Sequence, residues 1–131
     1  MKWKYVKKLE DINELKNFEF ENGCQIPSYL RKCIINYNGG RPERKVFDTA
    51  VSKGRMIKKL LSLNYGDVEN IWDAYKCMQQ EDRDLIPFAN DPGGNFICFN
   101  KDSGEIYLWL HETDTVEYVA ESFEDFLGKL K

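Results

Sequence analysis

The chain has 131 residues, of which 42% are apolar and 14% aromatic, enough to fill the core of one domain but not of two. No run approaches the roughly 18 apolar residues that a membrane-spanning helix needs, and no apolar stretch of signal-peptide length follows the charged start at residues 1–8, so we expect a cytoplasmic protein without a membrane contact. The net charge of −3 and the pI of about 5.3 argue against nucleic acid as a partner.

Two helices are predicted in the first third of the chain. Asp11 is a suitable N-cap for the first helix, and Gly23 stands where a glycine would end it. Its apolar face would consist of Ile12, Leu15 and Phe18. The second helix would begin at Pro27 and end at the turn-forming segment 38–40. Its apolar residues recur at three- and four-residue steps: Leu30, Cys33, Ile34 and Tyr37.

The middle of the chain carries weaker signals. Residues 46–51 are strand-like, and residues 56–63 fit either a buried strand or a short helix, because periodicity alone does not separate the two. A third helix is clearer, with Asp67 as its cap. Its apolar stripe would consist of Val68, Ile71, Trp72, Tyr75 and Met78.

The last third of the chain predicts a sheet. Four apolar runs of strand length follow one another: 85–89, 96–99, 106–110 and 116–119. Short turns join the strands, which should therefore run antiparallel, and Ser122 begins a capping box that opens a C-terminal helix. The sequence thus predicts the α+β class: a single domain over residues 1–131, mainly antiparallel β-sheet, with N-terminal and C-terminal helices packed against it.

The two halves of the chain carry opposite charge. Residues 1–66 contain 14 Lys and Arg against 7 Asp and Glu, whereas residues 67–131 contain 5 against 15. Such asymmetry indicates a charged partner, unless the fold mixes the two halves into a surface of balanced charge. The basic stretch 41–59 could contact nucleic acid, but no nucleic-acid-binding motif accompanies it.

Residues with catalytic or metal-binding chemistry are few. The cysteines, Cys24, Cys33, Cys77 and Cys98, include no C-x-x-C pair, and His111 is the only histidine. We therefore expect reduced thiols, no metal and no cofactor. His111 could act as a general base, but no nucleophile can be assigned to it, and its place at a strand end favours an ordinary exposed residue. The sequence predicts no catalytic residue and no enzyme.

The segment 90–95 is the sharpest local feature. Its glycines, aspartate and asparagines could cradle a phosphate or a cation, yet no lysine follows Gly94 and the carboxylates lack the spacing of a calcium loop. A turn between two strands fits better, with Asp91 and Asn95 bonding backbone groups.

Three stretches, in order and at fitting spacing, resemble the SUKH superfamily, specifically its Smi/Knr-type branch. They are Ile26-Pro27 through Asn38-Gly39-Gly40, the run from Ile86 to Cys98, and Ser122-Phe123-Glu124-Asp125-Phe126-Leu127. The resemblance runs from about Asp11 to Lys131, although 41–63 is hard to place and Leu30 and Cys33 replace frequent aromatics. It implies structural roles for the motif residues Pro27, Gly39, Gly40, Pro87, Gly93, Gly94, Asn95, Ser122, Phe123 and Phe126.

The resemblance also implies a function. Bacterial members of the superfamily are mostly immunity proteins, encoded beside polymorphic or contact-dependent toxins, and they neutralise the toxin domain, in some cases a nuclease, by binding it. The expected partner is therefore a cognate toxin protein domain, blocked by occlusion. The alternative is a regulatory or scaffold module of the cell-wall-regulator type, as in some eukaryotic members. No common activity or cofactor is attached to the family, and nothing in the sequence indicates an oligomeric state.

The partner-binding residues are expected on the acidic half of the chain. An acidic surface would match a toxin with a basic cleft, and exposed carboxylates there would steer association while contributing little to folding. Trp109 alternates with core-facing leucines and could be a surface anchor on the other face of the sheet. The predicted contact residues are Asp82, Asp84, Asp91, Trp109, Glu112 and Asp114. The simpler alternative is a solvated acidic face.

Overall fold

The computed structural model describes residues 1–78 and 84–131, which form an α+β fold as predicted. The helices are α1 (Asn13–Asn22), α2 (Ser28–Tyr37), α3 (Ile71–Met78) and α4 (Phe123–Lys129). The strands are β1 (Trp3–Lys4), β2 (Arg41–Pro42), β3 (Val46–Phe47), β4 (Arg55–Met56), β5 (Lys59–Leu60), β6 (Leu85–Asn90), β7 (Phe96–Asn100), β8 (Ile106–Leu110) and β9 (Thr115–Ala120).

The main sheet is antiparallel in the order β5-β6-β7-β8-β9. Strands β6 to β9 form the meander expected for strands joined by short turns, whereas β5 was not predicted there and is connected to β6 through α3. Its register shifts between Pro87 and Ala89, a bulge that accommodates a proline within a paired strand. The pairs β1-β2 and β3-β4 form small separate ladders. At the β9 edge, the backbone N–H of Ala50 donates to the Tyr118 carbonyl at 2.8 Å, so part of this edge is already covered.

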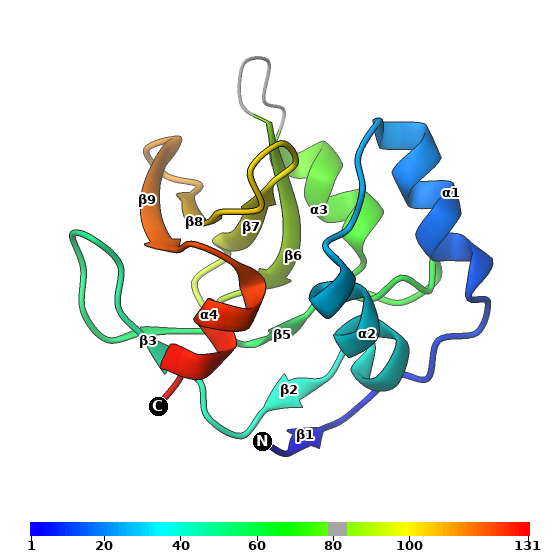
Figure 1. Cartoon of the computed structure of the whole chain (residues 1–131), viewed down its shortest axis with the longest axis horizontal. Coiled ribbons are helices and arrows are strands. Elements are labelled where there is room, and N and C mark those ends of the chain that lie inside the picture. The colour runs from blue at the N-terminus through cyan, green and yellow to red at the C-terminus, as the bar shows by residue number, and fades with distance from the viewer. Residues whose placement is uncertain (79–83) are drawn as a thin grey trace.

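The main core lies on one face of the sheet, beneath α2 and α4, which lie side by side (Figure 1). Phe88 of β6 meets Phe123 of α4 edge to face at 5.3 Å, and Phe47 meets Phe126 in the same way at the same distance. Ser122 begins α4 as predicted, because its Oγ accepts from the backbone N–H of Asp125 at 3.0 Å. Two of the motif phenylalanines are thus central core residues.

The Asn38-Gly39-Gly40 motif fastens the N-terminal segment to the fold. The buried Asn38 side chain donates to the Lys7 carbonyl (2.8 Å) and the Ser62 hydroxyl (3.0 Å), and it accepts from the Leu63 backbone N–H (2.8 Å). A side chain at position 40 would come within 2.8 Å of the Tyr37 carbonyl oxygen, which explains the glycine there. Pro27 immediately precedes α2.

The helix boundaries and faces differ from expectation in four places. Gly23 ends α1 in a left-handed conformation as predicted, but Ile12 is 58% exposed and lies off the buried face. Helix α3 begins at Ile71, not after Asp67, because Asn70 Oδ1 accepts from the Asp73 backbone N–H at 2.9 Å and provides the cap. Val68 consequently precedes the helix and is exposed. Tyr37 is partly exposed and stacks on Trp3 at 5.4 Å.

The middle segment is strand, in shorter pieces than predicted. Only Val46–Phe47 of the expected strand 46–51 is paired, since residues 49–52 turn back on themselves through bonds from Thr49 to Ser52. The ambiguous segment 56–63 contains β5, whose pairing with β6 places it at the sheet edge.

Candidate functional site

The turn between β6 and β7 is held by its own side chains. Asp91 Oδ1 accepts from the backbone N–H groups of Gly93 (2.9 Å) and Asn95 (2.8 Å), and Oδ2 accepts from Asn95 Nδ2 (2.9 Å). Asp91, which we predicted both as a turn residue and as part of the acidic partner surface, is 8% exposed. It therefore serves the turn, and its carboxylate is not presented at the surface.

The turn between β8 and β9 is tied to the first turn. The His111 backbone N–H donates to Asn95 Oδ1 at 3.0 Å. His111 Nε2 lies 3.0 Å from the Gly93 carbonyl oxygen and donates a hydrogen bond to it in the tautomer that carries the proton on Nε2. The histidine side chain is exposed at a strand end, as expected. The two turns thus form one connected end of the sheet.

Trp109 lies on the outer face of the sheet, which we define as the face opposite the main core and which carries Phe96, Cys98, Tyr107, Trp109, Val116 and Tyr118. The face was predicted correctly, but the surface anchor was not, because Trp109 is only 5% exposed. Its ring stacks on Phe96 at 5.9 Å, and its Nε1 donates to Asp114 Oδ1 at 2.8 Å. Asp114 therefore helps to hold the fold, contrary to the expectation that its charge serves association alone.

The predicted acidic residues do not form one cluster. Glu112 and Asp114 are exposed in the turn between β8 and β9, next to the Asp91 turn. Asp84 precedes β6 at the opposite end of the sheet, where its carboxylate lies 3.5 Å from Lys101 Nζ. Asp82 lies outside the described residues.

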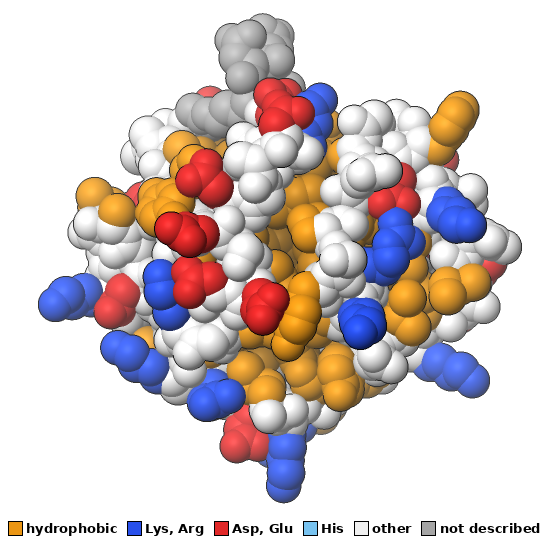
Figure 2. Space-filling model, in the orientation of Figure 1, with side chains coloured by type: hydrophobic (Ala, Val, Ile, Leu, Met, Phe, Trp, Pro, Cys, Tyr) orange, Lys and Arg blue, Asp and Glu red, His pale blue; other side chains and the backbone are white. Residues whose placement is uncertain are grey.

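A pair of partly exposed tyrosines lies on the outer face. Tyr107 and Tyr118 are cross-strand neighbours whose rings meet edge to face at 5.7 Å, and the Tyr107 hydroxyl donates to Glu105 Oε1 at 3.3 Å. Partial burial, followed by the charges of Glu121 and Glu105, raises the pKa of Tyr118 above its ordinary value. On the left of Figure 2, apolar side chains over β9 are bordered by acidic ones. The phenols stay neutral at physiological pH and can donate hydrogen bonds.

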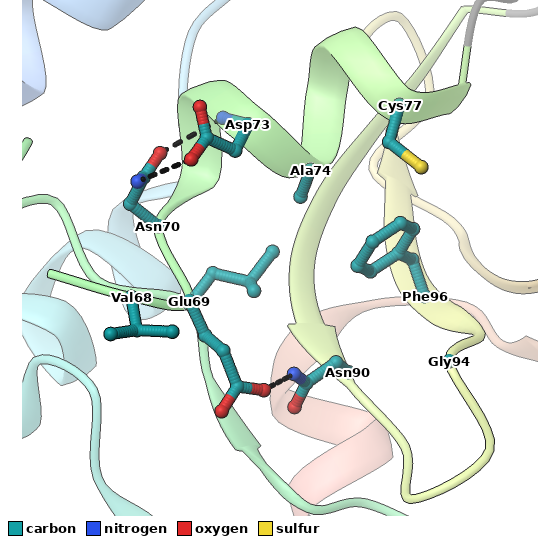
Figure 3. Close-up of a pocket in the computed structure, with 10 residues that line it drawn as sticks. Val68, Glu69, Asn70, Asp73, Ala74, Cys77, Asn90, Gly94 and Phe96 are labelled. Carbon is teal, nitrogen blue, oxygen red and sulfur yellow. Dashed lines mark hydrogen bonds between the residues drawn. The ribbon is translucent and has the colours of Figure 1, made fainter.

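A pocket of about 320 Å³ opens between α3 and the ends of β6 and β7 (Figure 3). Apolar walls come from Leu61, Ala74 and Phe96, and Cys77 of α3 lies at its border. Phe96 also stacks on Trp109, so the pocket adjoins the outer face. Its shape and lining suit an apolar side chain or small apolar group.

On the polar side of this pocket, the charge of Glu69 is balanced by neighbouring side chains. The Glu69 carboxylate lies 3.1 Å from both Lys58 Nζ and Lys59 Nζ, and it accepts a hydrogen bond from Asn90 Nδ2. Burial alone would raise the pKa of Glu69, but these three donors together lower it below the ordinary value. The bond to Glu69 fixes the Asn90 amide orientation, and Asn90 Oδ1 is buried with no hydrogen-bond partner among the described residues.

Metal-binding and thiol groups are two kinds of side chain among the described residues that could form reactive arrangements. Among residues 1–78 and 84–131, no group of three or more His, Cys, Asp or Glu side chains is placed to hold a metal ion. All four cysteines are free thiols, and burial raises the pKa of Cys24 to about 11 and of Cys33 to about 12, which suppresses the reactive thiolate. Within the same described ranges, no helix is long and apolar enough to cross a bilayer.

The fold partly cancels the charge asymmetry of the sequence. Arg55 of the basic half pairs with Glu117 of the acidic half at 3.4 Å, just as Lys58 and Lys59 pair with Glu69. Among the acidic side chains of the second half, Glu105, Glu121 and Asp125 act electrostatically on Tyr118 of the Tyr107–Tyr118 pair. Sequence reasoning missed this pair and Glu105, although strand alternation from Trp109 would have placed Tyr107 on the same face.

Two comparisons with known proteins bear on this chain. The model of the SMI1/KNR4 family (SUKH-1) matches residues 10–129, a range that includes every helix of the described residues. The SPbeta prophage-derived uncharacterized protein YokK of Bacillus subtilis (strain 168) is 28% identical over 141 aligned positions, which cover 89% of this chain and 72% of that protein.

Proposed function

The chain belongs to the SMI1/KNR4 family (SUKH-1), and we propose that it is an immunity protein, which binds a cognate bacterial toxin domain and neutralises it by occlusion. Bacterial members of the family are mostly immunity proteins, and the similar Bacillus protein is described as prophage-derived, a genetic setting that suits such a role. In this role the chain acts in the cytoplasm and performs no reaction of its own.

The observation that carries the proposal is the outer face, with its partly exposed tyrosine pair between carboxylates. Tyrosine and tryptophan are enriched at protein interfaces because they combine large contact area with few rotatable bonds. Trp109 lies on the same face and is held there by its stacking on Phe96 and its bond to Asp114. A surface held in place before binding loses little conformational entropy when the complex forms.

Blocking a toxin domain would use only a small fraction of the accessible surface of this molecule. A standard interface buries about 800 Å² on each partner, compared with a total accessible surface of 7458 Å². We expect this area to be buried over the β7–β9 region and the two turns that are hydrogen-bonded to each other at its end. A toxin whose substrate cleft faces this region would be blocked without any change in its own active-site residues.

The proposal expects a toxin gene beside the gene for this chain, and the test is protection of cells from the toxin domain that it encodes. That domain is expressed in a test bacterium from an inducible promoter, with and without this chain, and growth and toxin activity in lysates are measured. We expect restored growth, loss of toxin activity and a stable complex on size-exclusion chromatography. Cell death in the presence of well-expressed, folded chain would refute the proposal. A core-disrupting Phe126→Asp variant is the negative control, since Phe126 is fully buried.

A further inference from the structure

We propose that the toxin domain docks on the outer face around Tyr107 and Tyr118, through a segment that carries lysine or arginine side chains. This inference rests on the proposed function and adds to it the binding face and the chemistry of the partner. Its core residues are Tyr107, Tyr118, Glu105 and Glu121.

The aromatic part of this surface is available for contact. Helices α2 and α4 cover the main-core face of the sheet, whereas Tyr107 and Tyr118 on the outer face stay partly exposed and Val116 is 38% exposed. The tyrosine rings hold each other edge to face at 5.7 Å, so their outward surfaces have a fixed orientation. A partner therefore meets a firm apolar patch.

The charge around this patch selects a basic partner. Glu105 reaches the pair from the turn between β7 and β8, and Glu121 follows β9. Glu105 accepts from the Tyr107 and Ser103 hydroxyls, and among the described residues neither Glu105 nor Glu121 forms an ion pair. Asp125 of α4 adds a third carboxylate, although Lys129 lies 3.1 Å from it. The negative potential of these groups also contributes to the raised pKa of Tyr118.

Lysine and arginine suit both components of the surface. Their aliphatic stems can pack on the tyrosine rings while their charged ends reach the carboxylates. A cation over a tyrosine face gains a further cation–π attraction, a contact this chain already makes between Arg41 and Tyr5 at 5.7 Å. An acidic partner would be repelled by the same carboxylates, and a second copy of this chain would oppose like charges across a two-fold axis.

Binding across the face is favoured over addition of a strand to the β9 edge. The Ala50 backbone N–H already bonds the Tyr118 carbonyl, and Thr49 Oγ1 donates to Glu117 Oε1 at 2.7 Å. Arg55 also pairs with Glu117 at 3.4 Å. These contacts occupy the middle of the edge, so an incoming strand would have to displace them.

The first test is charge reversal with a matched control. Glu105→Lys/Glu121→Lys changes the outer face, and Glu21→Lys/Glu43→Lys makes the same change in net charge at exposed positions outside it. Association of each variant with the neighbouring toxin domain is measured at low and physiological salt. The outer-face variant should associate at least about tenfold more slowly at low salt, and the control within about twofold of the unaltered chain. Equal rates for the two variants would overturn the inference.

The second test concerns the tyrosines. Tyr118→Ala should weaken toxin binding by about tenfold or more, mainly through faster dissociation, whereas Tyr118→Phe should keep most of the affinity. Thermal melting of each variant shows whether the fold is intact. If Tyr118→Ala melts like the unaltered chain and binds the toxin as tightly, the docking face lies elsewhere.

A basic peptide tests the surface chemistry without the toxin. A 12-residue peptide of alternating arginine and alanine should perturb the amide NMR signals around Tyr107 and Tyr118, and Glu105→Lys/Glu121→Lys should abolish these changes. Changes centred on Glu21 or Glu43, or none, would overturn the inference. Failure of the proposed function looks different, because the unaltered chain would then not protect cells. If that chain protects and the outer-face variants protect equally well, only the docking inference fails.

Discussion

Replacing Gly94 tests whether the turn between β6 and β7 depends on a backbone conformation that favours glycine. Gly94 has φ +87°, where a residue with a Cβ is strained by about 1–2 kcal/mol and a β-branched residue by up to about 3 kcal/mol. The added Cβ would lie 3.4 Å from His111 Nε2, which is an ordinary van der Waals distance. The cost should therefore come from the backbone.

The expected losses can be separated from general effects of removing a glycine. Gly94→Ala should lower the free energy of unfolding by about 1 kcal/mol and Gly94→Val by about 2–3 kcal/mol, which for this chain length lowers Tm by roughly 3–12 °C. Gly93→Ala is the matched control, since Gly93 has no positive φ and its Cβ would meet Asn95 Nδ2 at an ordinary 3.5 Å. Urea unfolding followed by circular dichroism measures all three. Equal midpoints for Gly93→Ala and Gly94→Ala would refute the argument.

Single contacts elsewhere give further tests. Asp114→Lys should lower the free energy of unfolding by about 1 kcal/mol, because Trp109 Nε1 loses its acceptor, whereas Glu112→Lys in the same turn should leave the melting temperature unchanged. Because the pKa of Glu69 is lowered in the folded state, Glu69 is protonated in the unfolded chain at a higher pH than in the folded chain. The free energy of unfolding should therefore decline as the pH falls below the ordinary glutamate pKa of about 4.5. Urea unfolding between pH 3 and 7 should show a smaller decline for Glu69→Gln, and an equal decline would contradict the assignment. Of the four cysteines, only Cys77 is exposed, so one thiol per chain of the native protein should react rapidly with DTNB. Rapid reaction of a second thiol would contradict the burial of Cys24, Cys33 and Cys98.

The sequence predicted those parts of the fold that depend on nearby residues. Helix ends at Gly23 and Ser122 follow from backbone conformation and capping, which involve residues within one turn. The alternation of apolar residues in 106–110 placed Leu108 and Trp109 on opposite faces of the sheet, as the structure has them. The family signature likewise consists of short motifs, and it identified the family over most of the chain.

The sequence did not predict which of the residues expected at the surface form contacts within the fold. Asp67 was expected to cap α3, but its carboxylate accepts from Ser62 and Asn64 in the preceding turn, so Asn70 takes the cap. Trp109 was expected at the surface, yet it is buried against Met78, Cys98 and Phe96 on the outer face. In each case a polar or aromatic side chain contacts a residue that helix or strand propensity does not predict as its neighbour.

The candidate docking surface was decided only by tertiary structure. The excess of acidic residues in the second half of the chain was evident from the sequence. Ion pairs of Arg55 with Glu117, and of Lys58 and Lys59 with Glu69, neutralise part of this charge in the fold. What remains near the Tyr107–Tyr118 pair comes from a turn, a strand end and α4, which the meander brings together. Periodicity and capping are local and can be read along the chain, whereas the exposure of a face and the compensation of a charge depend on which distant segments pack against it.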